Sequence, residues 1–150
     1  MQQNHNKNSI PLIGAWKLIV FEMKMSNGDV FYPYGENAHG SIIYTDTGRF
    51  SAQLMNPDRP QFASRDILQG TDEEIKTNYT FFMSYYGHYE FHGDEGFVIH
   101  NVEGSLFPNW EGQPQKRFFE LSDNKLKLSS LPTMAGGIEI VGSINWERIS

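Results

Sequence analysis

Short runs in which apolar and polar residues alternate recur along the chain, and each run ends at a cluster of Gly, Asn, Asp or Ser. The clearest run covers residues 138–148, where Ile138, Ile140, Ile144 and Trp146 share one face of an extended chain. Alternation with a period of two is typical of strands with one buried face, and regularly spaced turns between such strands favour an all-β sandwich or barrel. The pattern therefore predicts a series of antiparallel hairpins.

We predict about eight strands, a number that encloses an interior just wide enough for packed side chains or one small ligand. They cover residues 16–24, 40–44, 49–55, 88–92, 97–105, 115–121, 125–129 and 138–148, with a brief extra pairing at 30–32. An antiparallel up-and-down barrel suits this order because closure removes the exposed sheet edges. The predicted fold class is therefore all-β.

One segment departs from the strand pattern. Thr71 and Glu74 have the spacing of a capping box, in which each residue bonds the backbone N–H of the other. Apolar residues follow at helical spacing as far as Met83. The sequence therefore predicts one α-helix near residues 72–84, ended by Gly87.

Length and composition limit the domain organisation and the partners. The chain has 150 residues, which suits one domain, placed at residues 12–150 after a polar tail at 1–11 that we expect to be disordered. A net charge of −6 with only 12 Lys and Arg gives no electrostatic reason to bind nucleic acid or an anionic membrane. No apolar run is long enough to span a membrane. The N-terminal residues lack the apolar core of a secretory signal, so we expect a cytoplasmic protein.

Strand alternation directs two arginines toward the predicted interior. Arg117 shares the inner face of its strand with Phe119. An inward arginine is costly without a partner, so Arg117 either reaches solvent at the barrel mouth or pairs with a ligand anion. Arg148 continues the inner face of the last strand, and we expect it to stack over Trp16 as a structural plug of the barrel floor.

His100 is the other candidate for chemistry inside the barrel. It is in phase with Val98 and Val102, which predicts that it faces the interior. A buried histidine can act as a general acid or base, or it can be a core residue held by hydrogen bonds. We therefore name His100 and Arg117 as the candidate catalytic residues, with ordinary structural roles as the alternative.

The chain is rich in aromatic residues, at 14%. Tyrosines combine an apolar ring with a polar tip, which suits a pocket for a ring-bearing molecule, although each one could equally be ordinary core. The candidate ligand-binding residues are Tyr34, Tyr44, Gln53, Tyr85, Tyr89, His100, Trp110, Arg117 and Phe119.

We predict no metal and no cofactor. Cys is absent, which excludes thiol catalysis and Cys-ligated zinc. His88, Glu90 and His92 alternate at a spacing that could chelate a metal, but their neighbours Tyr89 and Phe91 should take the inner face and leave them in solvent. Phosphate-binding and dinucleotide-binding motifs are also missing from the sequence.

Two short motifs at the ends of the predicted barrel resemble the lipocalin and calycin signature, namely Gly14-Ala15-Trp16 and Trp146-Glu147-Arg148. Further segments, in order along the chain, resemble the bacterial and fungal lipocalin-like domain family: LIGAWKL (12–18), YPYG (32–35), SAQLM (51–55), DRPQFAS (58–64), GTDEE (70–74) and VEGSLFPNW (102–110). The resemblance implies an eight-stranded calycin-type barrel with an internal cavity. It also implies small-molecule binding, often beside enzymes of secondary metabolism, and some similar folds are cofactor-free cyclases, isomerases or hydrolases.

Three functions stay open at this point. The first is binding of a small, largely apolar, ring-bearing molecule, linked to secondary metabolism. The second is a cofactor-free enzyme in the same cavity, using His100 and Arg117 for acid–base and electrostatic catalysis. The third is a partner-docking barrel with a filled interior. Ile19, Phe21 and Phe118 are expected to point outward and could form a homodimer interface.

Overall fold

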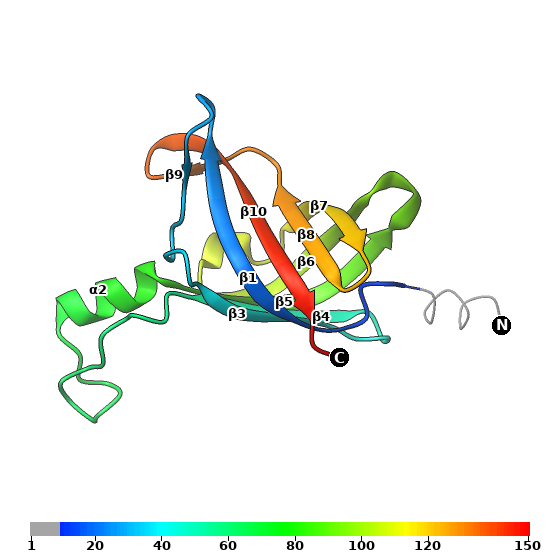
Figure 1. Cartoon of the computed structure of the whole chain (residues 1–150). Coiled ribbons are helices and arrows are strands. Elements are labelled where there is room, and N and C mark those ends of the chain that lie inside the picture. The colour runs from blue at the N-terminus through cyan, green and yellow to red at the C-terminus, as the bar shows by residue number, and fades with distance from the viewer. Residues whose placement is uncertain (1–9) are drawn as a thin grey trace.

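The computed structural model describes residues 10–150, which are dominated by β-structure (Figure 1). The helical elements are α2 (Asp72–Thr80) and the 3-10 turns η1 (Gly93–Glu95) and η2 (Pro108–Trp110). The strands are β1 (Gly14–Met25), β2 (Val30–Phe31), β3 (His39–Tyr44), β4 (Arg49–Met55), β5 (Phe82–His92), β6 (Phe97–Ser105), β7 (Pro114–Ser122), β8 (Lys125–Ser130), β9 (Thr133–Ala135) and β10 (Ile138–Arg148).

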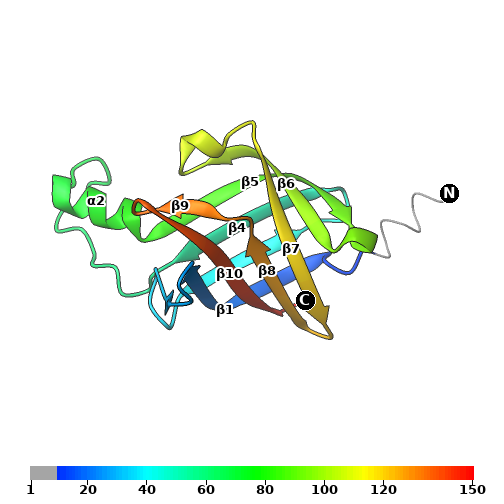
Figure 2. The same cartoon turned by 90° about the horizontal axis from the view of Figure 1, so that it is seen from above.

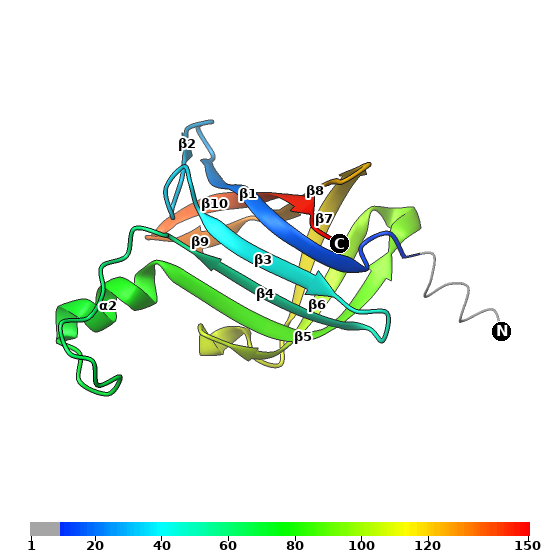
Figure 3. The same ribbon diagram turned by 60° about the horizontal axis from the view of Figure 1, so that its bottom comes forward.

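The sheet closes on itself, which confirms the predicted eight-stranded antiparallel barrel. The strands are hydrogen-bonded in the order β1-β3-β4-β5-β6-β7-β8-β10, and β10 pairs back onto β1, with Arg148 opposite Trp16. Figure 3 shows β1, β3, β4 and β5 side by side in one wall, and in Figure 2 β7, β8 and β10 cross that wall. β2 and β9 are short additions to β1 and β10. Ile138 pairs with β9 and is exposed, unlike the rest of the predicted inner face.

A β-bulge in β1 changes which of its residues face inward. The pairing with β10 shifts between Leu18 and Val20, so Ile19 is the extra residue. A bulge of this kind reverses the alternation beyond it, and both Leu18 and Phe21 are buried. The expected outward position of Phe21 is therefore wrong, whereas Ile19 and Phe118 are exposed as expected.

The capping box is present, but the helix is shorter than predicted. Thr71 and Glu74 each accept a hydrogen bond from the other's backbone N–H, and α2 begins at Asp72 as expected. It ends at Thr80 because the following segment becomes β5 and pairs with β4 and β6. Gly87 lies within β5, where an added Cβ would collide with the carbonyl of Asn101. This glycine therefore permits close strand approach and does not end the helix.

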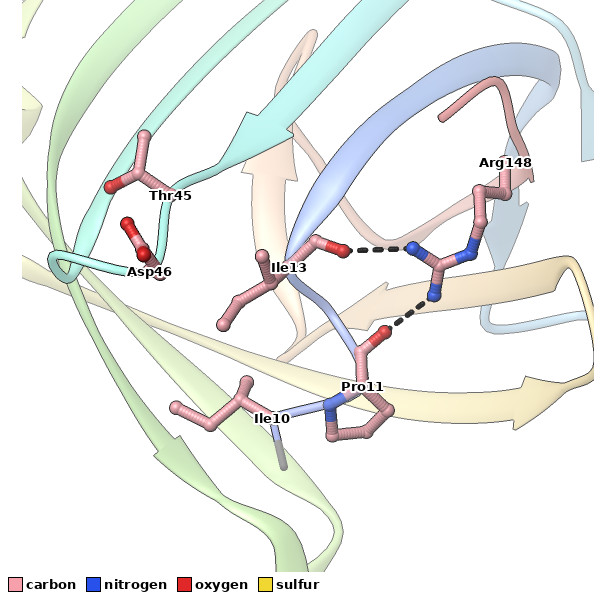
Figure 4. A pocket seen from close by; sticks show the side chains of 6 residues that line it. All are labelled: Ile10, Pro11, Ile13, Thr45, Asp46 and Arg148. Carbon is pink, nitrogen blue, oxygen red and sulfur yellow. Dashed lines mark hydrogen bonds between the residues drawn. The ribbon is translucent and has the colours of Figure 1, made fainter. Parts of the chain in front are cut away.

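The residues before β1 seal one end of the barrel. Leu12 is fully buried, and the Trp16 indole donates a hydrogen bond to its carbonyl at 2.9 Å. The Arg148 guanidinium lies 4.3 Å from the centre of the Trp16 ring, which confirms the predicted stacking. It also donates to the carbonyls of Ile13 and Pro11, at 2.8 and 2.6 Å (Figure 4). Pro11 ends the predicted tail, whose residues 1–9 lie outside the described residues.

Candidate functional site

His100 lies at the centre of the barrel interior, on β6 between the inward residues Val98 and Val102. It is fully buried, and it is the one buried side chain among residues 10–150 that is neither apolar nor a tyrosine. The Tyr44 hydroxyl from β3 lies 2.6 Å from its Nε2, and the Tyr85 hydroxyl from β5 lies 3.1 Å from its Nδ1. Both ring nitrogens therefore have partners, which explains how a histidine is tolerated in this core.

The environment keeps this imidazole neutral. Burial is the main cause that lowers the pKa of His100 well below its usual value, and the positive charge of Arg117 lowers it further. A neutral imidazole has one N–H and one lone pair, so one tyrosine donates to the ring and the other accepts from it. Burial also raises the pKa of Tyr44 well above its ordinary value, so this hydroxyl keeps its proton.

The two hydrogen-bond lengths favour one assignment of the roles of the tyrosines. O–H donors form shorter bonds than N–H donors, so the 2.6 Å contact fits Tyr44 donating to Nε2. The 3.1 Å contact fits the Nδ1–H of His100 donating to the Tyr85 oxygen. In this arrangement the hydroxyl proton of Tyr85 is not used by His100 and can be donated to a bound molecule.

Arg117 lies on β7, opposite Val98 of β6, and its side chain is half-buried. Its Nη1 donates to the Gln115 side-chain oxygen at 3.4 Å and to the Lys116 carbonyl at 3.3 Å, both long contacts. Within the described part of the chain, Arg117 has no carboxylate partner in an ion pair. The guanidinium therefore brings a largely uncommitted positive charge close to His100.

Trp110 from η2 joins these groups at the edge of the barrel. Its ring meets the Tyr85 ring edge to face at 5.3 Å, and the Arg117 guanidinium lies 5.9 Å from its centre. Phe50 of β4 stacks on the His100 ring at 4.3 Å. The structure thus brings together the predicted residues Tyr44, Tyr85, His100, Trp110 and Arg117.

The other predicted residues are farther from this group or already engaged. Tyr89 packs on Tyr44, but its hydroxyl donates to the Thr45 carbonyl at 2.7 Å. Phe119 stacks on Phe91 at 5.3 Å, toward the closed end. Gln53 lies on the outer face of β4, opposite to the buried Ala52 and Leu54, and bonds the Ser51 hydroxyl, so the structure does not bring it to His100.

Tyr34, from the loop between β2 and β3, packs edge-on against Phe21 at 5.3 Å. Burial, with a smaller contribution from Tyr79, raises the pKa of Tyr34 to about 12. This tyrosine is therefore a neutral part of the β1 side of the interior.

Two features of the interior were not predicted. Phe50, which stacks on His100, could have been found from its alternation with Ala52 and Leu54. Nearer the floor, where Trp146 pairs with Leu18 and Leu126, its buried indole nitrogen has no hydrogen-bond partner among the described residues. No sequence pattern reveals an unpartnered donor, because it depends on the positions of acceptors from other strands.

Burial differs between the two ends of the interior. Inward residues near the floor, such as Trp16, Val98 and Leu126, are almost completely buried. At the opposite end, Leu54 and Ile140 are also almost completely buried, whereas Met23 and Met83 are only partly buried. Arg117 lies between these levels and is itself partly buried, and α2 projects outward at the end opposite the floor (Figure 1).

Two surface pockets lie away from this group. One, of about 580 Å³, is at the floor between Arg148 and Asp46, and its lining side chains are drawn in Figure 4. The other, of about 400 Å³, lies on the outer wall beside His88 and Glu103. Neither is lined by a residue predicted to bind ligand.

The outer wall carries a second polar cluster. Arg49 makes a bidentate ion pair with Glu103, at 2.7 and 3.0 Å, and His88 adds a contact at 3.1 Å. The hydrogen bonds from Arg49 and then His88 lower the pKa of Glu103 to about 2. His88 and Glu90 face outward as the alternation predicts, and residues 10–150 contain no group of three or more potential metal ligands. The helices of the described chain are all too short or too polar to span a membrane.

Comparison with known proteins shows the family to which this chain belongs. The lipocalin-like domain family model matches residues 13–149. The "4'-hydroxy-3'-methoxypropiophenone carrier protein ppsC" of Aspergillus oryzae is 33% identical over 106 residues, which are 66% of this chain and 96% of the relative. A lipocalin-like protein from Bacteroides uniformis has a solved structure with a TM-score of 0.48 and 14% identity, covering 92% of this chain and 98% of that one. The chain belongs to the lipocalin-like domain family.

Proposed function

We propose that this protein binds a small, largely apolar, ring-bearing molecule inside the barrel and carries it within a secondary-metabolite pathway of the cytoplasm. The observation that carries the proposal is the Tyr44–His100–Tyr85 chain beside the uncommitted guanidinium of Arg117. These few polar groups lie in a wall of aromatic and aliphatic side chains, the usual composition of a small-molecule site. The Aspergillus relative is named as a carrier protein, which supports the same function.

The chemistry of that relative's named compound fits the groups present here. A hydroxylated, methoxylated propiophenone has one aromatic ring, a ketone and a phenol. Trp110 and Phe50 offer ring faces and edges, while Tyr85 and Arg117 offer hydrogen-bond donors to the oxygens. We therefore choose 4'-hydroxy-3'-methoxypropiophenone as the probe of this proposal.

The test is calorimetric titration of the full chain with this probe, comparing Tyr85→Phe with Tyr86→Phe. The two tyrosines are neighbours in β5, but Tyr85 faces the interior and Tyr86 is exposed. Loss of one hydrogen bond of about 1 kcal/mol should weaken probe binding about fivefold in Tyr85→Phe. Tyr86→Phe should bind as the wild type does. Absence of probe binding to the wild type, or equal weakening in both variants, would contradict the proposal.

A cofactor-free enzyme is the second candidate, favoured by one specific observation. Neutral His100 touches a hydroxyl on each ring nitrogen, so it could pass a proton between Tyr44 and Tyr85. Incubation of the probe with the wild type, followed by mass spectrometry and by hydrogen–deuterium exchange at the carbon next to the ketone, tests this role. Exchange that is catalysed by the wild type and lost in His100→Gln supports an enzyme, and the absence of catalysed exchange supports a carrier.

A further inference from the structure

Two side chains of this group, Arg117 and Tyr85, have hydrogen-bond donors that the described part of the chain does not use. Arg117 has five N–H groups, and the two contacts it makes both come from Nη1. In the hydrogen-bond assignment that the bond lengths favour, the Tyr85 hydroxyl keeps a proton that His100 does not use. Acceptor oxygens on a bound molecule would satisfy these donors.

The interior also has a charge without a counter-charge. None of the acidic residues in the described chain is buried, and Arg117 takes part in no ion pair there. The acidic side chains flanking the inward residues point to the outer wall, as Glu103 and Glu90 do. A half-buried cation with no carboxylate nearby favours an anion in the space it faces.

From these two observations we propose that the barrel binds its ligand as an oxyanion, specifically an acyl phenol in its phenolate form, with Arg117 as the charge partner and Tyr85 as the second donor. This inference rests on the proposed function and deepens it. An acyl group conjugated with the ring delocalises the phenolate charge, so such a phenol loses its proton readily. Arg117 then gains the partner that the protein itself does not provide.

The other titratable groups facing this space do not accept the phenol proton. They are Tyr44 from β3, Tyr85 and Tyr89 from β5, and His100 from β6; β1, β4, β8 and β10 turn apolar residues inward, among them Phe21, Phe50, Leu128 and Ile144. His100 is kept neutral by burial and by Arg117, which lower its pKa. Protonation of His100 would also place a second positive charge beside Arg117. The proton therefore leaves to the buffer when the ligand binds.

The experiment follows the phenol-to-phenolate transition of 4'-hydroxy-3'-methoxypropiophenone by its long-wavelength phenolate absorbance, free and bound. We expect the midpoint of the bound probe to lie at least one pH unit below that of the free probe, which means at least tenfold tighter binding of the phenolate. Calorimetry in buffers of different ionisation enthalpy should show release of a proton when binding is measured between the bound and the free midpoints. A probe that binds with an unchanged or raised midpoint overturns the inference and leaves the proposed function standing.

Variants at adjacent positions of β7 separate the interior charge from a general charge effect. Arg117→Met should abolish the lowering of the midpoint, and Arg117→Lys should restore part of it. Lys116→Met removes the same charge from the outer face, where Lys116 lies over Phe97 at 4.0 Å, and should leave the midpoint lowered. Equal effects of Arg117→Met and Lys116→Met overturn the inference.

The methyl ether of the probe, 3',4'-dimethoxypropiophenone, provides the last comparison because it cannot ionise. It should bind the wild type at least tenfold more weakly than the phenol does above the free midpoint, and Arg117→Met should bind the two compounds equally. An ether that binds the wild type as tightly as the phenolate overturns the anion inference alone. Failure of both compounds to bind overturns the proposed function as well.

Discussion

The floor and the middle of this barrel each contain an inward arginine, and the two differ in their partners. At the floor, Arg148 donates to two backbone carbonyls and lies over Trp16. In the middle, Arg117 makes two long contacts with its own strand and has no carboxylate partner within residues 10–150. Strand alternation turns both arginine side chains inward, so the inward direction alone does not reveal their roles. The hydrogen-bond partners distinguish a structural arginine from one available to a ligand.

The largest expected effect is on stability at the floor. Arg148→Met removes two charge-assisted hydrogen bonds and the contact with Trp16, and we expect it to lower the free energy of unfolding by about 3 kcal/mol. Arg117→Met should change it by less than about 1 kcal/mol, because a cation without a good partner is replaced by an apolar chain of similar length. Urea denaturation of both variants, followed by circular dichroism, measures the difference.

If Arg117→Met lost more unfolding free energy than Arg148→Met, Arg117 would be the structural arginine and the contrast between the two would be wrong. The variant Arg148→Lys tests whether the shape of the guanidinium matters in addition to its charge. Lysine keeps the charge but has no planar fork to reach two carbonyls while stacking on an indole, so most of the stability loss should remain.

The next effect is a pH dependence of the folding stability, which we expect His100 in the middle of the barrel to cause. In the unfolded chain His100 takes up a proton near pH 6.5, but burial and Arg117 keep it neutral in the folded protein. The unfolded state therefore binds more protons below pH 6.5, and the folded state loses stability as the pH falls. The loss should approach a limiting slope of about 1.4 kcal/mol per pH unit below pH 6.5.

Denaturation at several pH values, compared with His100→Gln, isolates this contribution because the variant has no group to titrate there. The control is His39→Gln, since His39 is exposed at the start of β3. Its pH dependence should match that of the wild type. If His100→Gln also keeps the full wild-type slope between pH 6.5 and 5, another group is responsible.

The smallest effect on the free energy of unfolding is expected on the outer wall, where Arg49 and Glu103 form an ion pair but remain exposed. Glu103→Gln breaks the bidentate pair with Arg49, but both side chains are exposed and their attraction is screened by salt. We expect a small loss of stability at low ionic strength that vanishes in about 1 M NaCl. A salt-independent loss as large as that of Arg148→Met would show that partner geometry matters even without burial.

Most of the fold could be predicted from residue patterns because strand alternation and turn residues act locally. The ranges of β4, β6 and β10 match the predicted ones. The errors arose where tertiary pairing overrides local preference. Phe82 and Met83 continue the helical apolar spacing but pair with β4, and β9 is a short pairing that forms only beside β10.

Which side chains of the candidate site face inward could be predicted, but the hydrogen bonds between them could not. Alternation indicated that His100 and Arg117 face inward, as they do. It could not indicate that Tyr44 and Tyr85 would contact opposite nitrogens of one ring, because three separate strands set that geometry. Gln53 shows the opposite case, since its own strand already placed it on the outer face.

The extra residue at Ile19 has a consequence for comparing this barrel with its relatives. Residues of β1 before and after that position point inward with opposite parity, as Trp16 and Phe21 do. A homologue without the extra residue would keep the same floor but shift the later part of this strand by one position. Gapless alignment past Ile19 would then match the lining of one binding site with the outer surface of another, so ligand preferences should be transferred between relatives only after this offset has been checked.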